Sequence, residues 1–74
     1  MKVEVRLFAG FREGRFDRQV MDLPDAATLR ELAGRLDIPA EQVSLPLING
    51  KYSSLDQPLA DDDVAALFPA VAGG

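Results

Sequence analysis

TLRELAGRL, residues 28–36, decides the fold of this 74-residue chain. Thr28 followed three residues later by Glu31 is a capping-box pattern, in which side chains satisfy backbone N–H groups left unpartnered at a helix start. Apolar residues then recur at i, i+3, i+4 and i+7, namely Leu29, Leu32, Ala33 and Leu36. We therefore predict a short helix that Pro39 ends and whose leucines enter the core.

Two strand patterns precede this helix. Residues 2–8 alternate, with Val3, Val5 and Leu7 on one side and Lys2, Glu4 and Arg6 on the other. Phe8 is in phase with the charged set, so we expect its ring on the solvated face. The segment 9–14 connects to a second alternating stretch, residues 15–23. One side of this stretch carries Phe16, Arg18, Val20 and Asp22, and the other side carries Asp17, Gln19, Met21 and Leu23. Neither side is uniformly apolar, so the register of this strand stays open.

Three further strands are expected after the helix. Residues 43–48 form the first, with Pro46 placed where its missing N–H would face solvent. Asn49-Gly50 is the strongest two-residue hairpin signal, and Lys51-Tyr52 begins a short return strand. The last strand covers residues 64–68 and ends at Pro69. The acidic run at 61–63 is interpreted as a solvated turn, with a docking site as the alternative.

This order of elements predicts a two-layer α+β domain, because a single apolar helix stripe must be buried against one face of a sheet. For the first and last strands to meet in the centre, the helix must cross over after the first hairpin. That arrangement is the β-grasp, or ubiquitin-like roll, with a mixed sheet of roughly four to five strands packed on one main helix. We assign residues 1–69 to this domain and residues 70–74 to a flexible C-terminal tail.

Composition argues against several classes of function. The chain has no Cys and no His, which removes thiolate chemistry and the commonest general base and metal ligand. Its net charge of −4 disfavours nucleic acid as a partner. No apolar run approaches the roughly 20 residues that span a bilayer, and no signal segment precedes the first strand. We expect a cytoplasmic protein without membrane or nucleic-acid partners, without a metal and without catalytic residues of its own.

The sequence ends in Val71-Ala72-Gly73-Gly74. Two glycines make a thin stalk around which an enzyme channel can close while it reaches a terminal carboxylate. The alternative is an unimportant frayed end, since termini are usually loose. The domain to which the tail is attached decides between these interpretations.

Over its whole length the chain resembles the ubiquitin-like sulfur-carrier proteins, most closely the small subunit of molybdopterin synthase. The matching stretches are VRLFAGFREG (5–14), INGK (48–51), LADDDV (59–64) and LFPAVAGG (67–74). The related thiamine sulfur carriers share the N-G turn and the Gly-Gly end but usually begin differently, and Pro69 also favours the molybdopterin type. Two departures concern partner identity: the turn at 61–64 lacks the usual glycine and one residue, and Ala70 replaces a common second proline.

The resemblance implies a carrier and not an enzyme. An ATP-dependent adenylyltransferase related to ubiquitin-activating enzymes would adenylate the Gly74 carboxylate, and sulfur from a persulfide donor enzyme would replace AMP to give a thiocarboxylate. Because the acyl adenylate has a good leaving group, one difficult step becomes two easier ones. A larger synthase subunit would receive the sulfur for the molybdenum or tungsten cofactor. The chain itself would bind no cofactor, and the activating partner would use the ATP.

The resemblance also implies which residues meet the partner. Docking is assigned to Phe8, Tyr52, Phe68 and Pro69, and threading into the partner to Val71, Ala72 and Gly73. If Leu67 is buried, alternation puts Phe68 on the outer face with Phe8. The alternative is that these aromatics fill the core, a question most open for Tyr52. Other functions also stay open: a thiamine thiazole sulfur carrier, a protein modifier conjugated through Gly74, or an interaction domain with an idle tail.

Overall fold

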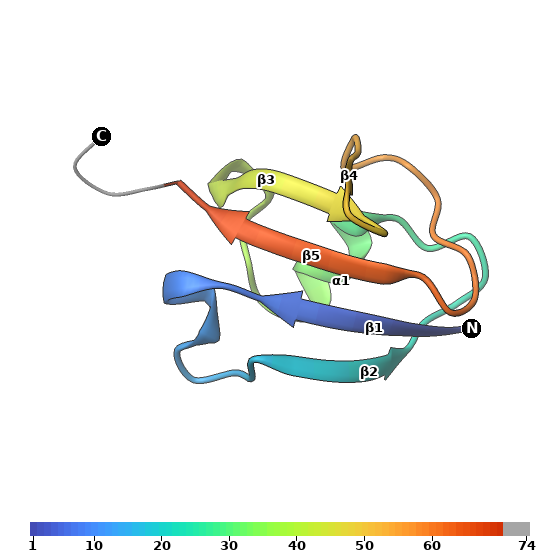
Figure 1. The fold of residues 1–74 in the computed structure, drawn as a ribbon, viewed down its shortest axis with the longest axis horizontal. Helices are drawn as coiled ribbons and strands as arrows, with labels where there is room; N and C mark the ends of the chain where they lie inside the picture. Colours follow the sequence, from blue (N-terminus) through green and yellow to red (C-terminus); the bar gives the residue numbers. More distant parts are fainter. Residues whose placement is uncertain (71–74) are drawn as a thin grey trace.

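Strands β1 (Lys2–Leu7) and β5 (Val64–Pro69) run parallel at the centre of the sheet in this computed structural model, which describes residues 1–70 (Figure 1). The full strand order is β2-β1-β5-β3-β4. β2 (Arg18–Asp22) pairs antiparallel with β1, and β3 (Val43–Ile48) pairs antiparallel with both β5 and β4 (Lys51–Tyr52). The predicted β-grasp is confirmed, with five strands. The predicted boundary between residues 69 and 70 stays a prediction.

Helix α1 (Leu29–Arg35) covers one face of this sheet (Figure 1). The Thr28 half of the predicted capping box is present, because the Glu31 N–H donates to Thr28 Oγ1 over 3.2 Å. The reciprocal bond from the Thr28 N–H to the Glu31 carboxylate is absent from residues 1–70. Leu29 and Leu32 are fully buried, whereas Leu36 is the C-cap and packs only partly against the core. The predicted stop at Pro39 is wrong: the helix ends at Arg35, and Asp37 has φ 58°. The positive φ of Asp37 turns the chain out of the helix before the proline is reached.

The core lies between α1 and the inner face of the sheet. Its largest fully buried side chains come from β1, α1 and β5: Val3, Val5, Leu7, Leu29, Leu32 and Leu67. The alternation predicted for β1 is therefore confirmed. Truncation of one buried leucine to alanine typically lowers the free energy of unfolding by about 2–5 kcal/mol, so these side chains hold the two layers together.

The connection from β1 to β2 differs from the predicted loop. It contains the 3-10 helix η1 (Ala9–Arg12), and Phe11 within η1 is buried in the core. β2 is shorter than predicted, because residues 15–17 still belong to this connection. Phe16 consequently packs against the core instead of following the alternation of Arg18 and Val20. Within β2 the predicted alternation holds, with Met21 opposite the buried Val3.

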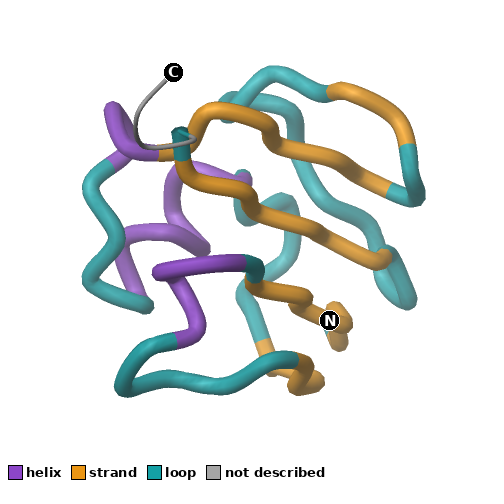
Figure 2. The backbone as a smooth tube through the Cα atoms, turned by 60° about the vertical axis from the view of Figure 1, so that its left-hand side comes forward, coloured by secondary structure: helices purple, strands orange, loops and turns teal. Residues whose placement is uncertain are grey.

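The turn between β3 and β4 has the predicted hairpin geometry, with φ 53° at Asn49 and 81° at Gly50. Pro46 lies inside β3, and its carbonyl accepts a hydrogen bond from Ser53 N–H just beyond the end of β4. The Pro46 nitrogen, which has no hydrogen to donate, faces the same side of β3 as its carbonyl, beyond the end of the short β4. The proline residue itself is buried. The end of β5 lies beside the start of β3, because Pro69 pairs with Val43 directly after the 3-10 helix η2 (Ala40–Gln42) (Figures 1 and 2).

Candidate partner-docking site

The face of the sheet away from α1 carries an apolar band. Cross-strand pairing places Phe68 of β5 beside Leu45 of β3, and Ala66 beside Leu47, which in turn lies beside Tyr52 of β4. We call this set the open-face band; it consists of Phe8, Leu45, Leu47, Tyr52, Ala66 and Phe68. Leu45 and Tyr52 are exposed, and no helix of residues 1–70 covers this side of the sheet. An exposed apolar area of this kind marks an interaction surface.

Phe8 and Phe68 form the centre of the band. Phe8 follows β1 in an extended conformation, with φ −132° and ψ 154°, so its side chain keeps the phase of the outer face. Leu7 pairs with Leu67 in the parallel ladder, which brings the next residue of each strand together. The two rings stack with centroids 4.0 Å apart and an interplanar angle of 8°. Both side chains are only half-buried, so the stack has one solvated side.

The two other residues predicted to dock, Tyr52 and Pro69, lie at different distances from this centre. Tyr52 is 73% exposed, which answers the open question about its position: it is not a core residue. It lies two strands away from β5, at the outer end of the band. Pro69 is half-buried at the end of β5, next to Phe68. The chain therefore leaves the sheet beside the aromatic stack. Gly74, Gly73, Ala72 and Val71 lie outside the described residues.

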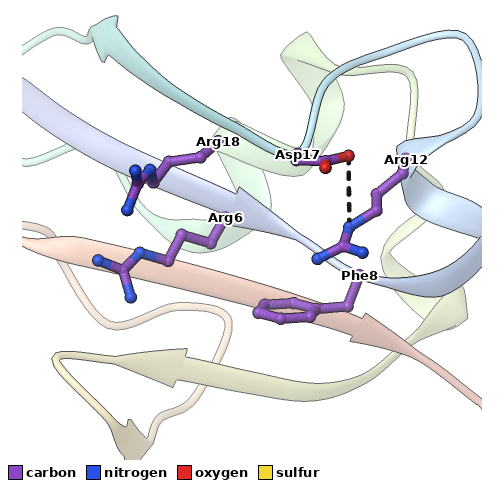
Figure 3. A pocket seen from close by; sticks show the side chains of 5 residues that line it. All are labelled: Arg6, Phe8, Arg12, Asp17 and Arg18. Atoms are coloured by element: carbon purple, nitrogen blue, oxygen red, sulfur yellow. Dashed lines mark ion pairs between the residues drawn. The ribbon is translucent and has the colours of Figure 1, made fainter.

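Arg12 is a member of this site that the sequence interpretation did not select. Its guanidinium carbon lies 5.1 Å from the centroid of the Phe8 ring, within cation–π range. Arg12 Nε donates to the Leu7 carbonyl over 2.7 Å and lies 3.5 Å from Asp17 (Figure 3). These contacts fix the position of the Phe8 ring. Arg12 lies in the stretch VRLFAGFREG that carries the family resemblance, but a solvated loop explained it equally well.

Two carboxylates of the described residues have lowered pKa values, and both belong to surface ion pairs. Bonding to Lys2 lowers the pKa of Asp22, and the hydrogen bonds from Arg30 lower the pKa of Asp56. Both are surface ion pairs, and neither contains a residue of the open-face band. Within residues 1–70, no group of three or more acidic residues is arranged to hold a metal ion. In the same range, no helix combines the length and apolarity that crossing a bilayer requires.

Comparison with known proteins relates the whole chain to ubiquitin-like carriers and modifiers. The sequence model of the ThiS family matches residues 5–74. Comparison with curated proteins gave no match.

Several solved structures are similar. A protein from Pyrococcus furiosus described as molybdopterin converting factor subunit 1 is 31% identical, with a TM-score of 0.75 over 96% of this chain and 99% of that one. Subunit 1 in a complex of molybdopterin-converting factor subunits 1 and 2 from Helicobacter pylori is 30% identical, with a TM-score of 0.62 and full coverage of both chains. SAMP1 from Haloferax volcanii is 27% identical, with a TM-score of 0.76, also over both full chains.

Proposed function

The chain belongs to the ThiS family, and on this premise we propose that it carries sulfur as a Gly74 thiocarboxylate for molybdopterin synthesis. It is at least a ubiquitin-like protein of the sulfur-carrier or modifier type. The observation that carries the proposal is the half-buried Phe8–Phe68 stack, which has one solvated side and lies at the end of β5, ahead of Gly73-Gly74 in the chain. The similarity to molybdopterin-converting subunit 1 from two organisms supports the choice of pathway.

In this proposal the protein is a cosubstrate and the catalysis belongs to its partners. An adenylyltransferase attaches AMP to the Gly74 carboxylate and releases pyrophosphate from ATP. The persulfide of a donor enzyme then displaces AMP to form an acyl disulfide. A second thiol cleaves this acyl disulfide, which leaves the thiocarboxylate on Gly74 and joins the thiol to the donor sulfur as a disulfide. The glycines add no side-chain bulk, so the acyl group can be presented at the end of a narrow stalk. The chain binds no cofactor of its own and works in the cytoplasm.

The folded body holds the tail in place by docking to a larger synthase subunit. Large, rigid aromatic side chains are typical anchors of protein interfaces. Phe8 and Phe68 supply two of them, and Pro69 fixes the direction in which the chain leaves. The complex of subunits 1 and 2 from Helicobacter pylori supports a partner of this kind. Val71, Ala72 and Gly73 then thread into the partner.

Intact-mass spectrometry tests the proposal directly. The protein is co-expressed with its adenylyltransferase under sulfur-replete conditions, and the mass is expected to rise by one oxygen-to-sulfur exchange that fragmentation places on Gly74. A variant lacking Gly74 is the matched control and should stay unmodified. Absence of the exchange in the wild-type protein would count against a sulfur carrier. A strain in which the gene is deleted tests the pathway: it should lose molybdopterin and still make the thiamine thiazole.

A protein modifier is the second candidate, favoured by the similarity to SAMP1 over both full chains. Gly74 would then be joined to lysine side chains of other proteins. Conjugates of higher mass that disappear when Gly74 is deleted would identify this function. If deletion of Gly73 and Gly74 leaves every cellular function intact, the tail is idle and the chain is an interaction domain only.

A further inference from the structure

Two arginines face each other on neighbouring strands of the open face. Arg6 of β1 and Arg18 of β2 are direct partners in the antiparallel ladder. Like charges at directly opposed positions destabilise a sheet, so the fold gains nothing from this pairing. The Arg6 side chain contacts Glu4 at 2.6 Å, whereas Arg18 forms no ion pair with any residue of 1–70. Arg18 therefore keeps a positive charge that no ion pair within residues 1–70 neutralises, whereas Arg6 shares its charge with Glu4.

The arginine pair is continuous with the aromatic stack. Together with Phe8, Arg12 and Asp17 it lines an open pocket of about 350 Å³. Figure 3 shows the side chains of Arg6 and Arg18 extending from their two strands in the same direction, while Arg12 turns toward Asp17. Arg12 is thus engaged by Phe8 and Asp17. Arg18 and, beside it, Arg6 with its partner Glu4 form the outward-facing cationic side of the pocket.

This corner of the sheet has the opposite charge to the rest of the protein. It contains Arg6, Arg12 and Arg18 with Glu4 and Asp17, so its charge is 3 − 2 = +1. The whole chain carries −4, which leaves −5 for all other residues. An acidic partner segment would be attracted to this corner and repelled by the net charge of the remainder. Charge complementarity of this kind fixes the orientation of a complex and speeds its formation.

We propose that Arg6 and Arg18 receive the carboxylates of an acidic segment on the larger synthase subunit while that subunit covers Phe8 and Phe68. Planar guanidinium groups suit this ligand because they bind carboxylates in a bidentate manner. The inference rests on the proposed function, since it requires a protein partner over the open-face band. It adds the chemistry of the partner's contact surface and a reason for the opposed arginines.

Charge reversal with a matched control tests the inference. Arg18→Glu is compared with Arg35→Glu, which makes the same change in net charge at the exposed end of α1, in the other layer. Affinity for the larger molybdopterin-synthase subunit of the same organism is measured by calorimetry at several salt concentrations. Arg18→Glu should weaken binding by at least about tenfold and reduce its salt dependence, while Arg35→Glu changes affinity by less than about twofold.

The stability of Arg18→Glu should stay the same or rise while its affinity for the partner falls. Glu at position 18 would oppose Arg6 and replace a repulsive pair with an attractive one, so Arg18→Glu should unfold at the same or a higher urea concentration than wild type. A loss of binding caused by misfolding would instead lower that midpoint. The two readouts therefore separate a docking residue from a structural one.

Cross-linking identifies the chemical class of the contact. An Arg18→Lys variant keeps the charge and adds an amine, which a carbodiimide can join to a carboxylate within contact distance. The expected product, mapped by mass spectrometry, links position 18 to an Asp or Glu of the larger subunit. If the wild-type protein binds but Arg18→Glu and Arg35→Glu behave alike, the inference is wrong and the proposed function stands. If the wild-type protein does not bind the subunit at all, both are overturned.

Discussion

Phe8 and Phe68 lie face to face with their ring centroids 4.0 Å apart, although sixty residues separate them in the chain. The parallel pairing of β1 with β5 brings them together, because Leu7 and Leu67 are register partners one residue earlier. Leu7 and Leu67 are fully buried, so the following residues must point to the opposite face. The core thus fixes the geometry of a half-buried aromatic pair on the outer face, although neither ring belongs to the core cluster.

The aromatic pair should be energetically coupled even in the isolated protein. A double-mutant cycle of Phe8→Ala, Phe68→Ala and the double variant should give a coupling of about 0.5–1.5 kcal/mol in the free energy of unfolding, measured with urea. Phe8→Ala combined with Tyr52→Ala is the control cycle and should be additive, because those two rings do not stack. A coupling of zero for Phe8 with Phe68 would contradict the stacked geometry.

Asn49 should contribute to stability through its side chain as well as its backbone. Its amide Nδ2 donates to Asp63 Oδ1 over 2.9 Å, and its Oδ1 accepts from Val64 N–H over 2.9 Å, which joins the hairpin to the start of β5. Asn49→Gly keeps the positive φ but removes both bonds, so we expect a loss of about 1–3 kcal/mol in urea unfolding. Asn49→Ala should lose more, because alanine also disfavours φ 53°. A stability of Asn49→Gly equal to wild type would show that only the turn conformation matters.

Ala26 should be improved by glycine. It is exposed in the turn before α1 and has φ 64°, a conformation that costs an L-residue with a Cβ atom. Ala26→Gly should raise the free energy of unfolding by about 0.5–1 kcal/mol after the entropic cost of glycine is included. Ala40→Gly in η2 is the control and should lower stability, since Ala40 is not among the positive-φ residues of 1–70. Equal effects of the two substitutions would contradict the argument.

The parts of the fold with local signals were predictable from the sequence. The Thr28 cap, the Asn49-Gly50 turn and the alternation in β1 each depend on residues a few positions apart, and all three are present. The burial of Phe11 was not predictable, because a segment rich in glycine and charge has the composition of a loop. Phe11 is buried because η1 packs against β5. No periodic apolar pattern in residues 9–14 indicates this packing.

The candidate site likewise has one part that local sequence signals predict and another part that they do not. The outward position of Phe8 followed from its phase with Lys2, Glu4 and Arg6. The stack with Phe68 and the opposition of Arg6 to Arg18 depend on the register of strand pairs, and no local signal sets that register. For β2 the mixed pattern of residues 15–23 left two registers open. Only the packing of Met21 opposite Val3 decides between them.

The ion pair between Arg30 and Asp56 should make a pH-dependent contribution to stability. Arg30 Nε and Nη2 donate to the two Asp56 oxygens over 2.8 and 3.2 Å, and this lowers the pKa of Asp56 below its usual 3.8. A lowered folded-state pKa stabilises the protein above the unfolded-state pKa, and this contribution disappears as pH falls through the folded-state value.

The measurement is the urea midpoint of wild type and Asp56→Asn between pH 7 and pH 2.5. The variant should be slightly less stable at neutral pH. The difference should shrink as the pH falls below 3.8 and vanish once the pH is below the folded-state pKa, where both states are protonated. The effect should be small because the pair is solvent-exposed. In an Arg30→Gln background, Asp56→Asn should have no such pH-dependent effect; a persistent difference there would assign the pKa change to another group.

Partner binding should depend on the centre of the open-face band far more than on its edge. Phe68 is half-buried beside Phe8 and Leu45, whereas Tyr52 is 73% exposed on the edge strand β4. Central, desolvated aromatics carry most of the energy of an interface, so Phe68→Ala should weaken binding to the larger synthase subunit by at least about 30-fold and Tyr52→Ala by less than about tenfold. Val20→Ala is the control: it removes an exposed apolar side chain from the same face on the opposite edge strand, β2. Circular dichroism should show all three variants folded. A Val20→Ala loss as large as that of Phe68→Ala would mean that the partner does not distinguish the aromatic centre from the rest of the sheet.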